Sequence, residues 1–233
     1  FAAGFANRLI VDPGATFSGQ VDGGNIIGGS VVSTLELASG ASTGRIGGIG
    51  STITNFARIA VDSGATWVLT GGNSLAAGVT LTNSGTVFAN GVLTDRGRID
   101  STGGTVIVGS TAGTNGTLTV GAGGTLAIGQ AGTNPALFIG NAGASGTLAA
   151  STGTVLVTGS GAALNAYGPV LVAKGTGASG LLEFAQGATG QVASSLETIQ
   201  AAIGIGLNGA GTLVVTDPGS VLTANGQVVV GRA

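Results

Sequence analysis

A short glycine-bounded unit recurs through the second half of the chain and constrains the fold more than any other feature. The unit at 116–129 reads GTLTVGAGGTLAIG, two apolar alternations separated by a glycine turn. Its opening Gly-Thr-Leu triplet is restated at 146–148 and 211–213, with Gly-Leu-Leu at 180–182 between them. Self-similarity at a period of about 20 to 50 residues indicates a solenoid or a repeat array. We therefore expect each unit to be one element of a stack.

A second family of repeats occupies the first half of the chain. The stretch FANRLIVDPGATF at 5–17 is restated as FARIAVDSGATW at 56–67, and VVTDPGSV at 214–221 is a third echo. Each copy reads as a strand, a D-x-G turn and a second strand, because Asp bonds nearby backbone and Gly accepts a positive φ. The first two copies are 50 residues apart, which is room for two turns of a solenoid. We expect the aspartate of each copy to form its turn: Asp12, Asp62 and Asp217.

These patterns predict an all-β fold, a right-handed parallel β-helix (β-solenoid). Leu follows Leu and Gly follows Gly from one repeat to the next, as stacked coils require, whereas a sandwich would alternate reversing hairpins. At about 22 to 25 residues per coil the chain would form roughly ten coils, and a spacing of about 4.8 Å gives a rod about 50 Å long. We divide this single solenoid into D-x-G-A-T repeats at 1–107 and G-T-L repeats at 108–233.

Most side chains have a place in such a solenoid, but one stretch departs from it. Small and aliphatic residues are expected to fill the narrow interior, and inward Asn, Ser or Thr at the corners to form hydrogen-bonded ladders. Ser194 and Glu197 have the spacing of a capping box, and apolar residues follow at helical spacing up to Ile203. The sequence therefore predicts a short helix near 195–203, which either packs on the side of the solenoid or forms a functional protrusion.

Composition excludes several classes of function. The 233 residues include 7 Lys and Arg against 9 Asp and Glu, a net charge of −2. Nucleic-acid binding and polybasic membrane attachment both need clustered cations. No stretch holds 18 consecutive apolar residues, as a membrane-spanning helix would. We therefore expect no nucleic-acid partner and no lipid-spanning segment.

The chain contains no cysteine, histidine or methionine. This excludes a disulfide framework, the usual zinc, copper and iron ligands, His general bases and Cys nucleophiles. The 48 glycines occur with a mean hydropathy of +0.55, which is too apolar for a disordered chain. A surface of Thr, Ser, Asn and Gly suits an extracellular setting. The chain begins in mid-pattern at Phe1, so we expect it to be a segment of a longer protein.

Motifs that suggest ligand chemistry are weak. Two G-x-G-x-x-G matches occur, at 175–180 and 204–209. A dinucleotide fingerprint follows a strand and opens a helix, whereas the first match leads into a strand and the second follows the expected helix. A row of threonines could suit an ice-binding face, but the T-x-T spacing does not persist. Its members would be Thr117, Thr119, Thr147 and Thr212.

The acidic residues do not cluster as a β-helix polysaccharide-degrading enzyme would require. Such an enzyme groups carboxylates on one face, often with basic partners or calcium. The closest pair is Asp95 and Asp100, but Arg96 and Arg98 lie between them and favour a local ion-pair network. We therefore predict that the chain is not an enzyme, with no catalytic, cofactor-binding or metal-binding residues.

Several of the repeats resemble those of a known family. VDPGATFSG at 11–19, VDSGATW at 61–67, LTNSGTV at 81–87 and the G-T-L units are similar to passenger repeats of Gram-negative autotransporters, the type V secretion proteins. The resemblance covers nearly the whole chain and implies a right-handed parallel β-helix, exposed at the cell surface or released. Such repeats serve as stalks for many activities, so the resemblance bears on architecture more than on function.

The sequence thus predicts an extracellular structural or adhesive stalk, part of a passenger exposed on a Gram-negative outer membrane or secreted. Host-cell surfaces or glycans would be its partners. One alternative is a filament subunit, because open β-helix ends expose strand edges that other copies can join end to end. A β-helix polysaccharide-degrading enzyme is the second alternative.

Overall fold

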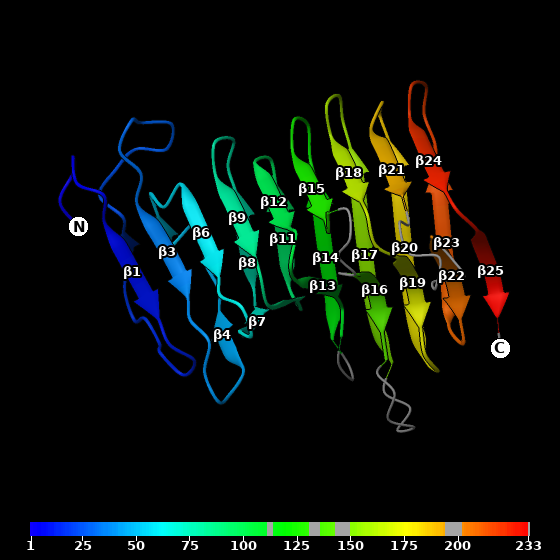
Figure 1. Cartoon of the computed structure of the whole chain (residues 1–233), viewed down its shortest axis with the longest axis horizontal. Helices are drawn as coiled ribbons and strands as arrows, with labels where there is room; N and C mark the ends of the chain where they lie inside the picture. The colour runs from blue at the N-terminus through cyan, green and yellow to red at the C-terminus, as the bar shows by residue number, and fades with distance from the viewer. Residues whose placement is uncertain (111–113, 131–135, 143–149, 194–201, 233) are drawn as a thin grey trace.

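The chain folds into a parallel β-helix with three long sheets. The computed structural model describes residues 1–110, 114–130, 136–142, 150–193 and 202–232. Successive turns of the chain pass through the same three sheets, so that equivalent strands stand side by side along the axis of a rod (Figure 1). The paired strands of the described residues run parallel. The predicted all-β parallel β-helix is confirmed.

Sheet A is the longest and has nine strands. Nine strands at about 4.8 Å make a stack about 40 Å long, close to the ten coils expected from the sequence. The strands in order are β1 (Arg8–Val11), β3 (Thr34–Leu37), β6 (Arg58–Val61), β9 (Thr80–Asn83), β12 (Arg98–Ser101), β15 (Thr125–Ile128), β18 (Ala163–Ala166), β21 (Thr189–Ala193) and β24 (Val221–Asn225).

Three further sheets complete the coils. Sheet C contains β4 (Gly44–Ile46), β7 (Thr66–Leu69), β10 (Thr86–Ala89), β13 (Thr105–Val108), β16 (Leu137–Asn141), β19 (Val170–Lys174), β22 (Ile203–Leu207) and β25 (Val228–Arg232). Sheet D contains β8 (Gly72–Leu75), β11 (Val92–Asp95), β14 (Asn115–Val120), β17 (Ser151–Thr158), β20 (Ala178–Ala185) and β23 (Ala210–Val215). The small sheet B pairs β2 (Val21–Asp22) with β5 (Ile53–Thr54) near the N-terminal end.

The D-x-G repeats lie two coils apart, as their spacing predicted. Arg8 of the first copy pairs with Thr34, and Thr34 pairs with Arg58 of the second copy. Coil length varies more than expected, from 18 residues between Thr80 and Arg98 to 38 between Thr125 and Ala163. The strand register is kept in both coils, since Thr80 pairs with Arg98 and Thr125 with Ala163. Sheet A continues from the D-x-G-A-T repeats into the G-T-L repeats by pairing β12 with β15.

One predicted repeat is wrong in its register. The partner of Gly116 on the next coil is Gly153 of β17, not Gly146, and the triplet 146–148 lies outside the described residues. The other two members are correct, because Gly153 pairs with Gly180 and Gly180 with Gly211. A row of glycines therefore crosses the N-terminal ends of strands β14, β17, β20 and β23 in sheet D: Gly116, Gly153, Gly180 and Gly211.

This glycine row exists because adjacent backbone leaves no room for a side chain. A Cβ on Gly153 would overlap the backbone nitrogen of Gly140 and the carbonyl oxygen of Val108. A Cβ on Gly116 would overlap the carbonyl oxygen of Ala89 in the same way. The corner between sheets C and D is thus closed by backbone packed on backbone, which only glycine permits.

Aliphatic rows fill the interior. The inward row of sheet A stacks residues that are at most 2% exposed: Leu35, Ile59, Leu81, Ile99, Leu126 and Leu164. Burial of each such side chain stabilises the fold by about 1.5–3 kcal/mol. The largest core residue is Trp67 in sheet C, whose indole N–H donates to the Ala38 carbonyl at 3.0 Å. Each coil therefore depends on its neighbours for a dry core.

Polar corner ladders form only locally. Asn83 lies beside Ser101 on the next coil and donates to its Oγ at 2.9 Å, and Ser101 in turn donates to the Gly104 carbonyl at 2.8 Å. The next residue in this row is Ile128, which ends the ladder after two coils. The predicted ladders are therefore confirmed in kind but not in extent.

The predicted helix near 195–203 falls mostly outside the described residues, which omit 194–201. Its last residue, Ile203, begins β22 and pairs with Val170, so the prediction is wrong at that end. An apolar residue at helical spacing also fits an inward strand position, and the buried neighbours of Ile203 decide for the strand. The described residues contain no helix, so none of them forms a helix that could cross a membrane.

Candidate functional site

The two nearest carboxylates in the sequence lie on different faces of the rod. Asp100 belongs to β12 in sheet A, where Arg98 Nη2 donates to its Oδ2 at 3.0 Å on the outer surface. Asp95 belongs to β11 in sheet D and points into the core, between Leu75 and Val120 of the adjacent coils. The predicted ion pair thus exists for Arg98 and Asp100, and Asp95 takes no part in it.

Asp95 is the one fully buried carboxylate among the described residues. Its Oδ1 accepts the Gly97 N–H at 2.9 Å, whereas its Oδ2 has no hydrogen-bond partner within the described ranges. Burial raises the pKa of this carboxyl to about 6, and the Gly97 N–H opposes the rise. The sequence held a signal for this position, because Asp95 has the same strand parity as the inward Leu93.

The aspartate and glycine motifs of the sequence lie in turns and strands. Backbone N–H groups donate to the carbonyl oxygens of Asp12 and Asp62 at 3.1 Å and of Asp217 at 3.3 Å, so the predicted aspartate turns are confirmed. The glycine motif at 175–180 joins β19 to β20, and the motif at 204–209 covers most of β22 and the turn after it. Neither match opens a helix.

The threonine row is incomplete in space as well. Along one outward row of sheet D, Thr117 pairs with Thr154, Thr154 with Leu181, and Leu181 with Thr212. The row begins with Gly72 and Val92, and Thr147 lies outside the described residues. Regular hydroxyl spacing is therefore interrupted on this face.

A hollow lies on the outer face of sheet A, which we call the arginine hollow. Its volume is about 420 Å³, and Arg58, Thr80 and Thr82 line it together with Ala60 and the exposed Val32. Arg8 and Arg98 occupy the same row as Arg58, but they are paired with Glu36 and Asp100. No salt bridge of Arg58 is found among the described residues, so the hollow combines a guanidinium with two hydroxyls.

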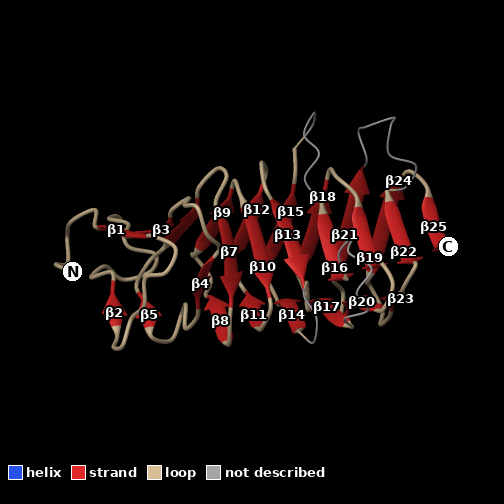
Figure 2. Ribbon diagram, turned by 90° about the horizontal axis from the view of Figure 1, so that it is seen from below, coloured by secondary structure: helices blue, strands red, loops and turns tan. Residues whose placement is uncertain are grey.

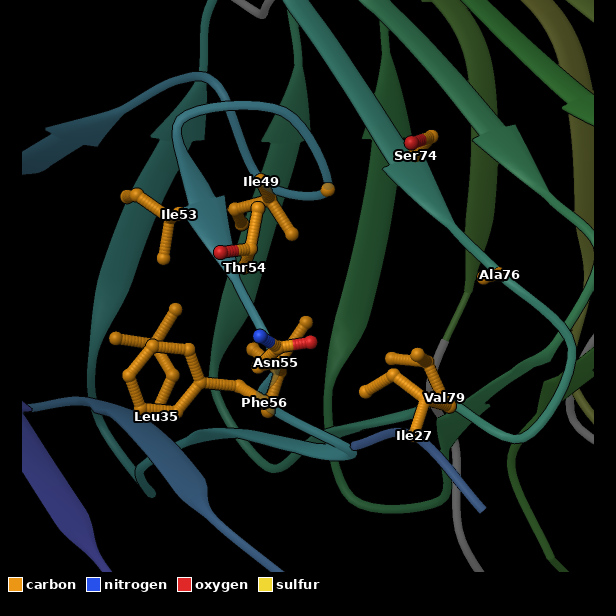
Figure 3. Close-up of a pocket in the computed structure, with 12 residues that line it drawn as sticks. Ile27, Leu35, Ile49, Ile53, Thr54, Asn55, Phe56, Ser74, Ala76 and Val79 are labelled. Carbon is orange, nitrogen blue, oxygen red and sulfur yellow. The ribbon is translucent and has the colours of Figure 1, made fainter. Parts of the chain in front are cut away.

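A second cavity, the seam pocket, lies near the N-terminal end and has a volume of about 190 Å³. Figure 3 shows Ile53, Phe56 and Leu35 on one side of it and Val79 and Ile27 on the other. Six of its apolar lining residues are at most 7% exposed: Leu35, Ile49, Ile53, Phe56, Ile59 and Val79. The polar lining side chains are the uncharged Thr54, Asn55 and Ser74.

The seam pocket exists because sheet B does not join sheet D. Figure 2 shows β2 and β5 in line with β8 and β11 along one edge of the rod. At Ile49 the chain still contacts β8, since the Ser74 N–H donates to the Ile49 carbonyl at 2.8 Å. A tight turn follows, in which the Ser51 N–H donates to the Gly48 carbonyl at 3.0 Å, and Ile53 then pairs with Val21 of β2. The core is left unfilled where the chain turns away from β8.

Comparison with known proteins does not assign the chain to a family. No family model, no curated protein and no solved structure matches the chain. Within the described residues, no group of three or more His, Cys, Asp or Glu side chains is placed to hold a metal ion. The rod, the arginine hollow and the seam pocket are therefore the features that bear on function.

Proposed function

We propose that this chain is a rigid, non-enzymatic stalk of an extracellular protein on a Gram-negative bacterial surface, of the autotransporter passenger type, with an adhesive outer face. The observation that carries the proposal is the continuous nine-stranded sheet A with its buried aliphatic rows. Each inner strand is hydrogen-bonded on both sides, so bending the rod would break backbone hydrogen bonds and expose core. Such a rod suits the display of a binding surface at a distance from the membrane.

The arginine hollow is the place on this rod that suits adhesion best. A guanidinium binds a carboxylate with two parallel hydrogen bonds, and the hydroxyls of Thr80 and Thr82 suit sugar hydroxyls. The ligand class that fits is an acidic glycan, whose carboxylate would meet Arg58. The two other arginines of the row already have carboxylate partners, which leaves Arg58 for an outside ligand.

A glycan array and a cell-binding assay test the proposal, with Arg58→Ser as the test variant. Arg96→Ser is the matched control, because Arg96 is also exposed but lies in the turn between β11 and β12. We expect acidic glycans or host cells to bind the wild type and Arg96→Ser, and binding to Arg58→Ser to fall at least about tenfold. Equal binding by all three proteins would remove the hollow from the proposal, and the absence of any binding would leave a spacer.

A further inference from the structure

We propose that the seam pocket is a binding site for one small, neutral, apolar molecule the size of a single aromatic ring. The proposal is independent of the stalk function, because the seam pocket and the arginine hollow share no lining residue. It rests on the volume of the pocket, the chemistry of its wall and its position in the fold.

The volume fits a single ring. An apolar cavity of about 150 Å³ lined by Leu, Ile and Phe stays dry and binds benzene in another protein. The seam pocket has a volume of about 190 Å³ and a similar lining, with Ile49, Ile53 and Phe56 each 4% exposed. It therefore holds one ring with a short substituent.

The uncharged lining of the seam pocket disfavours a charged ligand. None of the lining side chains carries a charge, so an ionised group would lose its hydration and gain no partner. Asn55, one of the three polar lining side chains, already donates through Nδ2 to Asp22 at 2.9 Å. An uncharged ligand buries its apolar surface at no such cost.

The position of the pocket gives the ligand a way in. Ile27, from the loop after β2, reaches across to the turn between β8 and β9, and its Cγ2 would lie 3.2 Å from a Cβ placed on Gly78. Ile27 is only half-buried, and Ala76, another lining residue, is exposed. The mouth is thus bounded by a loop and a turn rather than by paired strands of a long sheet.

The test uses toluene and benzoate, which share a ring and differ in charge, with the methyl groups of the isoleucines observed by NMR. We expect toluene to shift the signals of Ile49, Ile53 and Ile59 while Ile128 and Ile139, deep in later coils, stay unchanged. Benzoate should leave all of these signals in place. Shifts spread over both groups of isoleucines, no shift with saturating toluene, or equal shifts with benzoate would each overturn the proposal.

Two variants close the pocket and a third is their control. Val79→Phe puts a ring into the cavity, Ala76→Leu narrows its mouth, and Val92→Phe makes the matched change at an outward position that is 51% exposed. We expect the toluene shifts to disappear in Val79→Phe and to remain in Val92→Phe. If Val79→Phe does not fold, Ala76→Leu gives the answer. Unchanged toluene shifts in a folded pocket variant would contradict the assignment.

Discussion

The buried carboxyl of Asp95 should make the stability of the rod depend on pH. Its pKa rises from 3.8 to about 6 on burial. Because the native carboxyl keeps its proton to a higher pH than the unfolded one, unfolding releases a proton between about pH 4 and pH 6. Stability from this group is therefore greatest below about pH 4 and falls as pH rises through 6. At 1.36 kcal/mol for each unit of pKa, the loss is about 3 kcal/mol at neutral pH.

Asp95→Asn removes the ionisation and keeps an oxygen to accept the Gly97 N–H. Urea unfolding can be followed by the fluorescence of Trp67, the single tryptophan, which is fully buried. Asp22 and Asp62 are common to both proteins, so their titration cancels when the two pH profiles are subtracted. The side-chain amide that this substitution introduces buries N–H groups, and these destabilise the folded state by an amount that does not depend on pH. We therefore compare slopes rather than absolute stabilities.

The wild type should lose about 3 kcal/mol relative to Asp95→Asn between acidic and neutral pH, most of it between about pH 4 and pH 6. Parallel pH profiles for the two proteins would refute the reasoning, since they would mean that Asp95 is hydrated in the folded state. A difference of opposite sign would mean that the carboxylate has a stabilising partner.

Four further substitutions test the packing and one surface ion pair by urea unfolding. Gly153→Ala should destabilise the fold by about 3 kcal/mol or more, because the new Cβ would overlap neighbouring backbone. Gly123→Ala is the comparison, since Gly123 has open space around it at φ +76°, and it should cost only about 1–2 kcal/mol. Equal losses for the two variants would contradict the close backbone packing around Gly153. Leu118→Ala should lose about 2–5 kcal/mol, and a loss below about 1 kcal/mol would argue against a close-packed interior. Arg98→Ala should cost less than about 1 kcal/mol at low salt and nothing near 1 M salt, since its ion pair with Asp100 is exposed; a larger, salt-independent loss would mean that Arg98 has a packing role.

The fold was predictable because its information is local and repeated. The alternation in Leu118 and Val120 states which side chains face inward, and its recurrence states that equivalent strands stack. The 50-residue interval between Asp12 and Asp62 likewise gave two coils correctly. Period-2 alternation with like-on-like recurrence leaves few other solutions for so apolar a chain.

The register of one repeat was not predictable from matching triplets. Gly116 and its partner Gly153 are 37 residues apart, and the triplet at 146–148 is a better match in letters than the true Gly-Thr-Val partner. Corners accept insertions without disturbing strands, so residue counting fails where a corner is long.

The two cavities follow from contacts that no local pattern encodes. The seam pocket depends on the turn of the chain at Gly48, away from β8 and toward β2, which are far apart in sequence. The arginine hollow depends on the neighbouring coil, which places Thr82 beside Arg58 at the position that Glu36 has beside Arg8. Asp95 is different, since its strand parity with Leu93 is visible in the sequence and is enough to place it on the inward side.

The central claim is that the coils stack in parallel and in register, and distances between spin labels on one row of sheet A test it most directly. The chain has no native cysteine, so a cysteine placed at Thr34, Thr125 or Thr189 would be the only site that the spin label modifies. By the strand register, Thr34 lies four coils from Thr125 and six from Thr189. At about 4.8 Å per coil the two backbone distances should be about 19 Å and 29 Å. Label distances that rise by about 10 Å from the first pair to the second would support the account, and equal or decreasing distances would contradict it.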